Sequence, residues 1–247
     1  MEDSVFEVVN SQSDQVLILT CEHANADIPS EYNNLRLTAN DLDTHIARDK
    51  GCKEITRLLA QKLGCFAIMG NYSRLLIDLN RRVDEDELIV EVSDKVEVIG
   101  NKNLSIEERK SRLDKYYHPY YAEINNQIDY LKSQGKAPIV FSIHSYTPQL
   151  KGGDYRPWHA GILYHNPSSL ATYLYDELQK TDKNIGENVP YDLRKYNTGA
   201  AVICGEENGF DYALIEIRDD EFDNLEQGAN EWSDMLADIL KRYLQKQ

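Results

Sequence analysis

The chain has 247 residues, and its 27 lysines and arginines against 42 aspartates and glutamates give a formal net charge of −15. This charge argues against binding to nucleic acid, which needs a surface rich in basic side chains, but it allows a local basic pocket for a small anion. No apolar run approaches the ~20 residues of a membrane-spanning helix, and a chain of this length fits a single domain, which we expect to span residues 1–247.

Residues 1–4 lack the basic and apolar segments of a secretory signal, so we expect a cytoplasmic location. The four cysteines are scattered along the chain, without the paired spacing of a disulfide framework or a zinc ribbon. They are therefore expected to be buried or incidental thiols.

Apolar runs that end in polar turns alternate with longer segments of helical period, which is the pattern of an α/β layered domain. The first part of the chain predicts a strand over 16–19, a helix over 50–64 that Gly64 ends, and strands over 65–69 and 75–79. The segment 82–103 is acidic and irregular, and we interpret it as a surface excursion that could contain one hairpin.

The second part of the chain contains further helices and strands. Ser105 and Glu108 have the spacing of a capping box and begin a long helix that Pro119 should kink or split before Gly135. The elements that follow are predicted at strand 139–143, strand 161–164, helix 168–180, strand 213–217 and helix 223–246. Strands this apolar, separated by helices, predict a mixed, mainly parallel sheet covered on both faces, which is a three-layer α/β sandwich. Ligands of such sheets bind beyond the carboxyl ends of the strands.

Three predicted strands lead into residues suited to metal or acid–base chemistry, namely Glu22-His23, His144 and Glu216. A catalytic zinc needs about three protein ligands and one open position, and imidazole with carboxylate is a common set. His23 and His144 could therefore converge on one ion. The alternative for either histidine alone is a polar cap at the edge of the sheet.

Glu216 lies in an otherwise apolar strand, where an unpaired buried carboxylate is costly, so it needs a partner. One interpretation is a general base that deprotonates water. The other is a structural pair, either with Arg218, which the alternation of a strand places on the same face, or with another arginine.

Several segments resemble the zinc carboxypeptidases. Residues 141–146 resemble the segment that carries their second zinc-binding histidine, and residues 214–219 resemble the strand that carries their general-base glutamate. Residues 77–81 resemble the segment whose Asn-Arg pair, here Asn80 and Arg81, holds the terminal carboxylate of the substrate.

The resemblance is closer to a smaller relative, the N-formylglutamate amidohydrolase family. The most specific shared motif is Ser-Arg-Leu-x-x-Asp-x-Asn-Arg at residues 73–81. The other segments that are similar to this family are 21–24, 45–51, 118–121, 156–158 and 188–191. Together they extend from about residue 17 to residue 218.

The resemblance implies a zinc-exopeptidase-like fold, a bound zinc or other divalent ion, and hydrolysis of the amide bond of an N-acyl amino acid such as N-formylglutamate. It implies that His23 and His144 bind the metal and that Glu216 is the general base. The partner would then be a small molecule, with no membrane or nucleic acid involved, and the sequence carries no signal for an oligomeric state. The alternative is a metal-free ligand-binding or regulatory protein that keeps this fold.

The third metal ligand is left open by the sequence. The carboxypeptidase pattern has a ligand glutamate three residues after its first histidine, but Ala26 occupies that position here. We rank Asp49 first, because it would stand where the missing glutamate belongs if the residues before it formed an inserted loop. Glu22, Asp27 and His45 are the other candidates, and the ordinary role of an aspartate such as Asp49 is a helix N-cap.

Five residues are candidates for binding the substrate. Arg81 and Arg74 could hold its carboxylate, because a guanidinium binds a carboxylate through two hydrogen bonds and stays charged. Asn80 joins them through the resemblance, and Arg156 is a further candidate. Tyr191 could provide a phenol for the leaving amine or the oxyanion. The alternatives are surface ion pairs for the arginines and loop packing for the tyrosine.

Overall fold

The computed structural model describes residues 4–246. Residues 1–3, which contribute to the expected cytoplasmic location, and residue 247 lie outside this range. None of the helices within 4–246 is both long enough and apolar enough to cross a bilayer.

The elements of the described chain fall into strands, α-helices and short helical turns. The strands are β1 (Phe6–Val9), β2 (Leu17–Cys21), β3 (Phe66–Gly70), β4 (Val92–Ser93), β5 (Val96–Glu97), β6 (Ile139–Tyr146), β7 (Ala160–Leu163), β8 (Ile185–Glu187) and β9 (Asp211–Arg218). The α-helices are α1 (Ala39–Leu42), α2 (Cys52–Leu63), α3 (Ile106–Arg112), α4 (His118–Ser133), α5 (Ser169–Leu178) and α6 (Leu225–Leu244). The 3-10 helices are η1 (Ser30–Arg36), η2 (Asp86–Leu88), η3 (Ile99–Asn101), η5 (Leu193–Lys195), η7 (Glu206–Asn208) and η8 (Asp219–Phe222), and the π-helices are η4 (Leu113–Tyr117) and η6 (Ala201–Gly205).

A seven-stranded sheet with the order β1-β3-β2-β6-β9-β7-β8 forms the centre of the fold. The central strands β3, β2, β6 and β9 run parallel, and β7 and β8 are parallel to each other. The antiparallel pairs are β1 with β3 and β7 with β9. The prediction of a mixed, mainly parallel sheet is confirmed.

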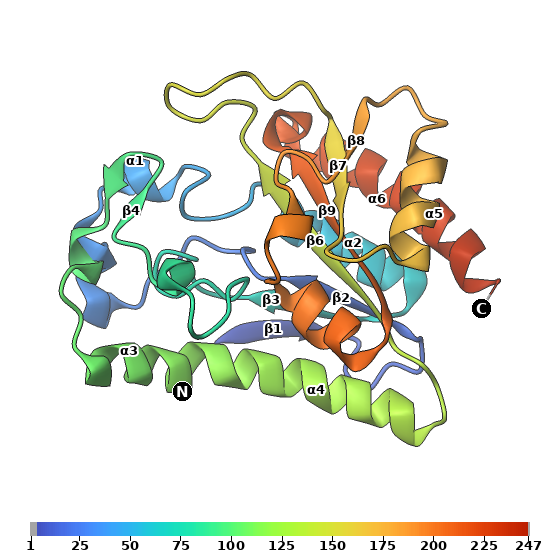
Figure 1. The fold of residues 1–247 in the computed structure, drawn as a ribbon, viewed down its shortest axis with the longest axis horizontal. Helices are drawn as coiled ribbons and strands as arrows, with labels where there is room; N and C mark the ends of the chain where they lie inside the picture. The colour runs from blue at the N-terminus through green and yellow to red at the C-terminus, as the bar shows by residue number, and fades with distance from the viewer. Residues whose placement is uncertain (1–3, 247) are drawn as a thin grey trace.

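Helices cover both faces of this sheet. Helices α2, α5 and α6 lie on one face and α4 lies on the other (Figure 1). Helix α2 packs against β2 and β3, α5 packs against β7, β8 and β9, and α6 lies against α2 and α5. On the opposite face α4 packs against β3, while η6 packs against β6 and β9. Strands β2, β3 and β6 are consequently buried along their whole length, as the predicted three-layer sandwich requires.

The predicted helix boundaries follow from their local residues. Gly64 ends α2 in a left-handed conformation with φ of 64°. The backbone N–H of Glu108 donates to Oγ of Ser105 at 3.1 Å, and the N–H of Ser105 donates to the Glu108 carboxylate at 2.9 Å, which is the predicted capping box of α3. The split near Pro119 is also confirmed, because the π-helix η4 separates α3 from α4 just before this residue.

The strand predicted over residues 75–79 is wrong. Residues 75, 76 and 79 lie in turns, in the first of which the N–H of Leu76 donates to the carbonyl of Ser73 at 2.9 Å. The N–H of Asp78 donates to the carbonyl of Leu88 at 2.8 Å, which is a contact between loops. Leu76 and its apolar neighbours are nevertheless buried. A short apolar run indicates that its residues are buried, but it does not show that they pair with a neighbouring strand. These residues are buried without such pairing and so do not form a strand.

The other predicted elements are present with small shifts at their ends. Strand β6 continues to Tyr146 because β9 pairs with it along its whole length, so His144 lies inside the strand and not after it. Strands β1 and β8 were not predicted. Each is a short edge strand of the sheet. Three or four residues are too few to show the alternation of apolar and polar side chains that predicts a strand.

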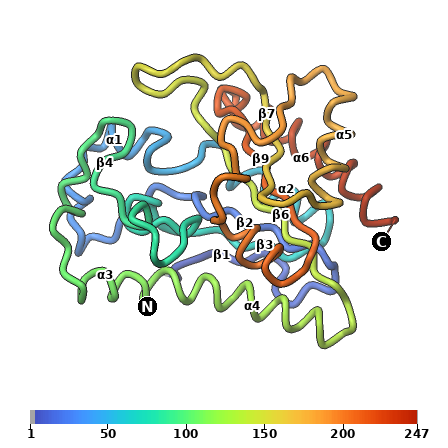
Figure 2. Tube along the Cα trace, in the orientation of Figure 1, coloured from blue at the N-terminus to red at the C-terminus, as the bar shows by residue number. Residues whose placement is uncertain are grey.

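Two surface segments lie near the end of β6. The acidic segment 82–103 contains the expected hairpin, formed by β4 and β5. The segment between β6 and β7 forms a long excursion at the top of Figure 2. The two segments meet where the N–H of Lys151 donates to Oδ1 of Asp94 at 3.0 Å.

Candidate active site

Two histidines and an aspartate meet at the carboxyl end of the central strands. His23 follows β2, His144 lies in the neighbouring strand β6, and Asp49 precedes α2. Nδ1 of His23 and Nδ1 of His144 lie 3.3 and 2.9 Å from the same Oδ2 atom of Asp49. All three residues are buried, and each offers a donor atom within 4.8 Å of the other two. The N–H of Asp49 also donates to the carbonyl of His23 at 2.9 Å, which brings the intervening loop back to the sheet.

A second layer of carboxylates orients the two imidazoles. Nε2 of His23 lies 2.7 Å from Oδ1 of Asp78, and Nε2 of His144 lies 2.8 Å from Oε2 of Glu22. Glu22 is held in turn by the hydroxyl of Tyr120, which donates to its Oε1 at 3.2 Å. Carboxylates behind histidine ligands fix the tautomer and the ring orientation. Nδ1 of each ring is therefore left directed at Asp49.

The carboxylates and imidazoles of this cluster stabilise one another's charged forms. Burial by itself opposes ionisation of the Asp49 carboxyl, but the adjacent His23 and His144 outweigh it and hold the pKa of this carboxyl below its usual range. Burial likewise opposes protonation of His144, and the Asp49 and Glu22 carboxylates outweigh it and raise the pKa of this imidazole. Two imidazole nitrogens and one carboxylate oxygen also form a donor set that suits zinc and similar divalent ions. The residues present thus fit a metal.

The other candidate ligands lie elsewhere. Glu22 contacts His144 from behind, as described above. Asp27 lines a separate surface hollow, and Nε2 of His45 lies 3.3 Å from Oδ2 of Asp94. Asp49 does not cap α2, because the N-cap of that helix is Gly51, with φ of 82°.

Glu216 stands beside the donor cluster on the neighbouring strand. In the parallel pair of β6 and β9, Glu216 lies directly opposite His144. The residue is 7% exposed, and among the described residues its Oε2 has no hydrogen-bond partner. Burial, with the charge of Asp49 adding to it, raises the pKa of the Glu216 carboxyl to about 7. Arg218 does not pair with it, since its Nε binds Oδ1 of Asp220 at 2.7 Å.

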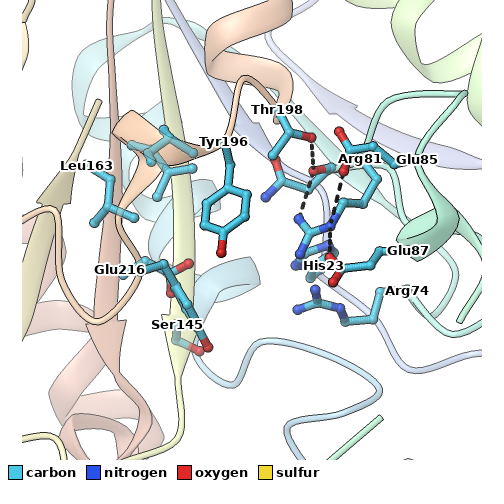
Figure 3. A pocket seen from close by; sticks show the side chains of 14 residues that line it. His23, Arg74, Arg81, Glu85, Glu87, Ser145, Leu163, Tyr196, Thr198 and Glu216 are labelled. Carbon is cyan, nitrogen blue, oxygen red and sulfur yellow. Dashed lines mark hydrogen bonds and ion pairs between the residues drawn. The ribbon is translucent and has the colours of Figure 1, made fainter. Parts of the chain in front are cut away.

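A cavity of about 310 Å³ opens beside this cluster. Figure 3 shows Glu216 and Leu163 on one side of the cavity and Arg81 on the other, with the ring of Tyr196 between them. The lining side chains are those of His23, Arg74, Asn80, Arg81, Glu85, Glu87, Ser145, Leu163, Tyr191, Leu193, Tyr196, Thr198, Leu214 and Glu216. One side of the cavity therefore carries arginines and exposed glutamates, and the other side carries Leu163 together with Glu216.

The two arginines of the cavity both contact carboxylates. Nη2 of Arg74 lies 2.8 Å from Oδ2 of Asp78, and its Nη1 lies 3.7 Å from Oδ1 of Asp49. Nε of Arg81 lies 3.0 Å from Oε2 of Glu87, whose side chain is 69% exposed. Arg74 is thus tied to the donor cluster, whereas Arg81 is held by a carboxylate that faces solvent.

Asn80 anchors the loop that covers the cavity. Its N–H donates to Oδ1 of Asp78 at 2.8 Å, and its own Oδ1 accepts a hydrogen bond from the N–H of Ala200 at 3.3 Å. Gly199 has φ of 93°, and a Cβ atom at this position would lie 2.6 Å from Oδ1 of Asn80. Only glycine allows this close approach.

Tyr191 lines the cavity, and Arg156 contacts this tyrosine from outside the cavity. The Arg156 guanidinium lies 4.8 Å from the ring centre of Tyr146 and 5.6 Å from that of Tyr191. Its Nη1 donates to the Tyr191 hydroxyl at 3.2 Å. The loop of Tyr191 passes so close to β7 that a Cβ atom on Gly161 would lie 1.7 Å from the carbonyl oxygen of Val189. Arg156 therefore orients Tyr191 and does not itself line the cavity.

Comparison with known proteins identifies the family. The model of the N-formylglutamate amidohydrolase family matches residues 15–222. The chain belongs to this family. It is 29% identical over 133 residues to an N-formylglutamate deformylase of Pseudomonas putida, and this match spans about half the length of each protein, 49% in both cases. The resemblance drawn from the sequence is thus confirmed at the level of the family.

Solved structures agree with this fold. A gene product of Agrobacterium tumefaciens superposes with a TM-score of 0.91 at 28% identity, over 99% of this chain and 96% of that one. The N-formylglutamate amidohydrolase of Ralstonia eutropha JMP134 superposes with a TM-score of 0.71 at 16% identity, over 96% of this chain and 98% of that one. The second likeness shows the fold alone.

The segments that resemble the N-formylglutamate amidohydrolase family come together in the structure. Residues 73–81 bring Arg74, Asn80 and Arg81 to the cavity, and residues 45–51 bring Asp49 to the donor cluster. Sequence reasoning missed Asp78 as a partner of His23, although Asp78 lies within the most specific motif. It also missed the leucines and Tyr196 that line the cavity. Leu214 had a usable signal, because it precedes Glu216 by two residues and so shares its face of the strand.

Proposed function

We propose that this chain is a metal-dependent amidohydrolase that cleaves the amide bond of an N-acyl amino acid, with N-formyl amino acids such as N-formylglutamate as the class that the family name suggests. The observation that carries the proposal is that the donor set of His23, Asp49 and His144 lies at one cavity with Glu216, whose Oε2 has no hydrogen-bond partner among the described residues. We take residues 1–247 as a single domain for this activity, of which the family match spans residues 15–222.

A zinc or other divalent ion would be held by Nδ1 of His23, Nδ1 of His144 and the carboxylate of Asp49. When bound, such an ion supplies the Lewis acidity that polarises an amide carbonyl and acidifies water. Asp78 and Glu22 would keep the imidazoles oriented toward it, which is the usual role of carboxylates behind histidine ligands.

Glu216 is the proposed general base. Its carboxylate takes a proton from water as the oxygen of that water bonds to the acyl carbon, and it returns the proton to the amide nitrogen as the C–N bond breaks. The products are a carboxylic acid, formic acid in the case of an N-formyl substrate, and a free amino acid. The proposal is supported by the position of Glu216 opposite His144 and by its Oε2, which accepts no hydrogen bond from the part of the chain that the structure describes.

Arg81 is the proposed binding residue for the substrate carboxylate. That carboxylate would replace Glu87 on the guanidinium and form two parallel hydrogen bonds with it. Asn80 holds the adjoining backbone and is proposed to complete this end of the site. Arg74 is proposed to share in binding at the cavity wall while it steadies Asp78.

Tyr191 is proposed to direct its hydroxyl at the leaving amine or at the oxyanion. Arg156 is proposed to bind substrate indirectly, because its guanidinium fixes the position of that hydroxyl. Both roles depend on the loop that packs against β7 at Gly161.

The proposal is tested by assaying N-formyl and N-acetyl amino acids with chelator-treated protein and with the same protein after zinc is restored. We expect release of free amino acid that disappears with the metal and returns with zinc. Hydrolysis that chelation leaves unchanged would contradict metal dependence. Binding of these compounds without hydrolysis in either state would favour the metal-free binding protein.

A further inference from the structure

Three buried tyrosines contact the site from the long helix on the face of the sheet opposite α2 (Figure 1). Tyr117 is the last residue of η4, and Tyr120 and Tyr121 lie in the first turn of α4. Spacings of three and four residues place their side chains on one side of a helix. The rings of Tyr117 and Tyr121 stack with their centres 4.5 Å apart, and those of Tyr120 and Tyr121 meet edge to face at 5.9 Å. We call these three residues the tyrosine face.

Two members of the tyrosine face hold the backbone that carries Arg81. The Tyr121 hydroxyl donates to the carbonyl of Leu79 at 2.8 Å. The Tyr117 hydroxyl donates to the carbonyl of Arg81 at 2.9 Å. Because this segment belongs to no strand, its carbonyl groups need partners other than a neighbouring strand. The carbonyl between them, that of Asn80, accepts a hydrogen bond from Nη1 of Arg81 at 3.1 Å. The two phenols thus fix the backbone at both ends of the turn from which the Arg81 guanidinium extends.

The third member, Tyr120, holds the carboxylate behind one of the proposed metal ligands. Its hydroxyl donates to Oε1 of Glu22 at 3.2 Å. The other oxygen of this carboxylate, Oε2, lies 2.8 Å from Nε2 of His144 and accepts a hydrogen bond from the Ser142 hydroxyl, also at 2.8 Å. Glu22 is 1% exposed, so water does not replace these partners. Tyr120 therefore helps to fix the carboxylate that orients the His144 ring.

We propose that the tyrosine face positions both ends of the active site. Tyr117 and Tyr121 hold Arg81 where it receives the carboxylate of the substrate. Tyr120 holds the carboxylate that keeps His144 directed at the metal. This inference rests on the proposed function. A tyrosine suits such a role because its ring packs in the core while its hydroxyl reaches a polar partner. Burial raises the pKa of the Tyr117 hydroxyl to about 12 and raises that of Tyr120 and Tyr121 well above its usual value, so all three remain hydrogen-bond donors.

Phenylalanine variants test the two roles separately, because each keeps the ring and removes only the hydroxyl. The substrate is the N-formyl amino acid that the unmodified chain hydrolyses fastest. Tyr117→Phe and Tyr121→Phe should each raise its KM by about three- to tenfold and change kcat by less than about twofold. Their zinc affinity should stay within about twofold of the unmodified value, since Arg74 still holds Asp78. Tyr120→Phe should show the reverse pattern. Its zinc affinity, measured by competition with a chelator, should fall by about tenfold, and the KM of the zinc-saturated protein should not change.

Tyr130→Phe is the matched control. Tyr130 lies on the same helix, and its hydroxyl donates to Oδ1 of Asp14 at 3.1 Å, but neither residue lines the cavity. This variant should change neither KM nor zinc affinity. Because Tyr117→Phe and Tyr121→Phe test the same role, either one serves if the other does not fold.

The outcomes separate this inference from the proposed function. If the three variants match Tyr130→Phe in KM and in zinc affinity, even with a lower melting temperature, the tyrosine face only stabilises the fold. The inference is then overturned and the proposed function stands. A KM that rises in Tyr120→Phe but not in Tyr117→Phe or Tyr121→Phe would also overturn it. If the unmodified chain hydrolyses no N-formyl amino acid, the proposed function fails, and the role proposed for the tyrosines that hold Arg81 fails with it.

Discussion

His144 in β6 lies directly opposite Glu216 in β9. This parallel strand pair thus carries a donor atom of the buried cluster and, on Glu216, an oxygen atom that has no hydrogen-bond partner in residues 4–246. The pairing fixes the spacing between the two side chains through the backbone of the sheet. Neither residue depends on a loop for its position. The residues proposed for metal binding and for proton transfer would therefore be held in register by two paired strands of the central sheet.

Glu216→Gln is expected to abolish turnover without loss of metal. The amide keeps the shape of the side chain but cannot accept the proton from water, so kcat should fall by about 10²–10⁴-fold. The assay pairs the rate of N-formyl amino acid hydrolysis with the metal content of the same sample. Activity near that of the unmodified chain would reject the role of Glu216 as base.

The carboxylates behind the two imidazoles are expected to control metal affinity. Glu22→Gln and Asp78→Asn each weaken the hold on one ring and should reduce zinc affinity by about 10–100-fold. Competition with a coloured chelator measures this directly. Asp27→Asn is the matched control, since Asp27 lies in a different hollow. Equal affinities across all three variants would show that Glu22 and Asp78 play no such part.

Glu87 is expected to compete with the substrate for Arg81. Its side chain is 69% exposed, and exposed ion pairs are weak, so Glu87→Gln should lower KM by about two- to fivefold with kcat unchanged. Arg81→Ala should instead raise KM strongly, because the carboxylate of the substrate loses its partner. Steady-state kinetics on a single N-formyl amino acid separates these effects. A higher KM in Glu87→Gln would mean that Glu87 helps to bind the substrate.

Salt is expected to accelerate the reaction at low substrate concentration. The net charge of −15 repels an anionic substrate over the distance at which it approaches, and ions screen this repulsion. We therefore expect kcat/KM to rise between low and physiological ionic strength. A fall over this range would indicate attraction between the protein and its substrate, and hence a cationic substrate.

Much of the fold could be predicted because its strands and helices are strongly patterned. The apolar runs around residues 16–19, 139–143 and 213–217 all correspond to central strands, and Gly64 and the Ser105 capping box end and begin helices as expected. The strand predicted over residues 75–79 is wrong because the apolar residues of this segment are buried without pairing to a neighbouring strand.

The site was harder to predict than the fold, because its parts come from distant segments. His23, His144 and Glu216 followed from their places near strand ends. The position of Asp49 depends on a loop whose return to the sheet is fixed by the hydrogen bond from the N–H of Asp49 to the carbonyl of His23, which no local pattern reveals. Leu163 and Leu214, which line the cavity, likewise come together through the pairing of β7 with β9.

The most direct test is elemental analysis of protein purified without chelators, for the unmodified chain, Asp49→Ala and the control Asp27→Ala. We expect about one divalent ion per chain in the unmodified protein and in Asp27→Ala, and a loss of most of it in Asp49→Ala, because structural and catalytic ions need their full ligand set. Less than about 0.2 ions per chain in the unmodified protein, even after incubation with zinc, would contradict the proposed metal centre.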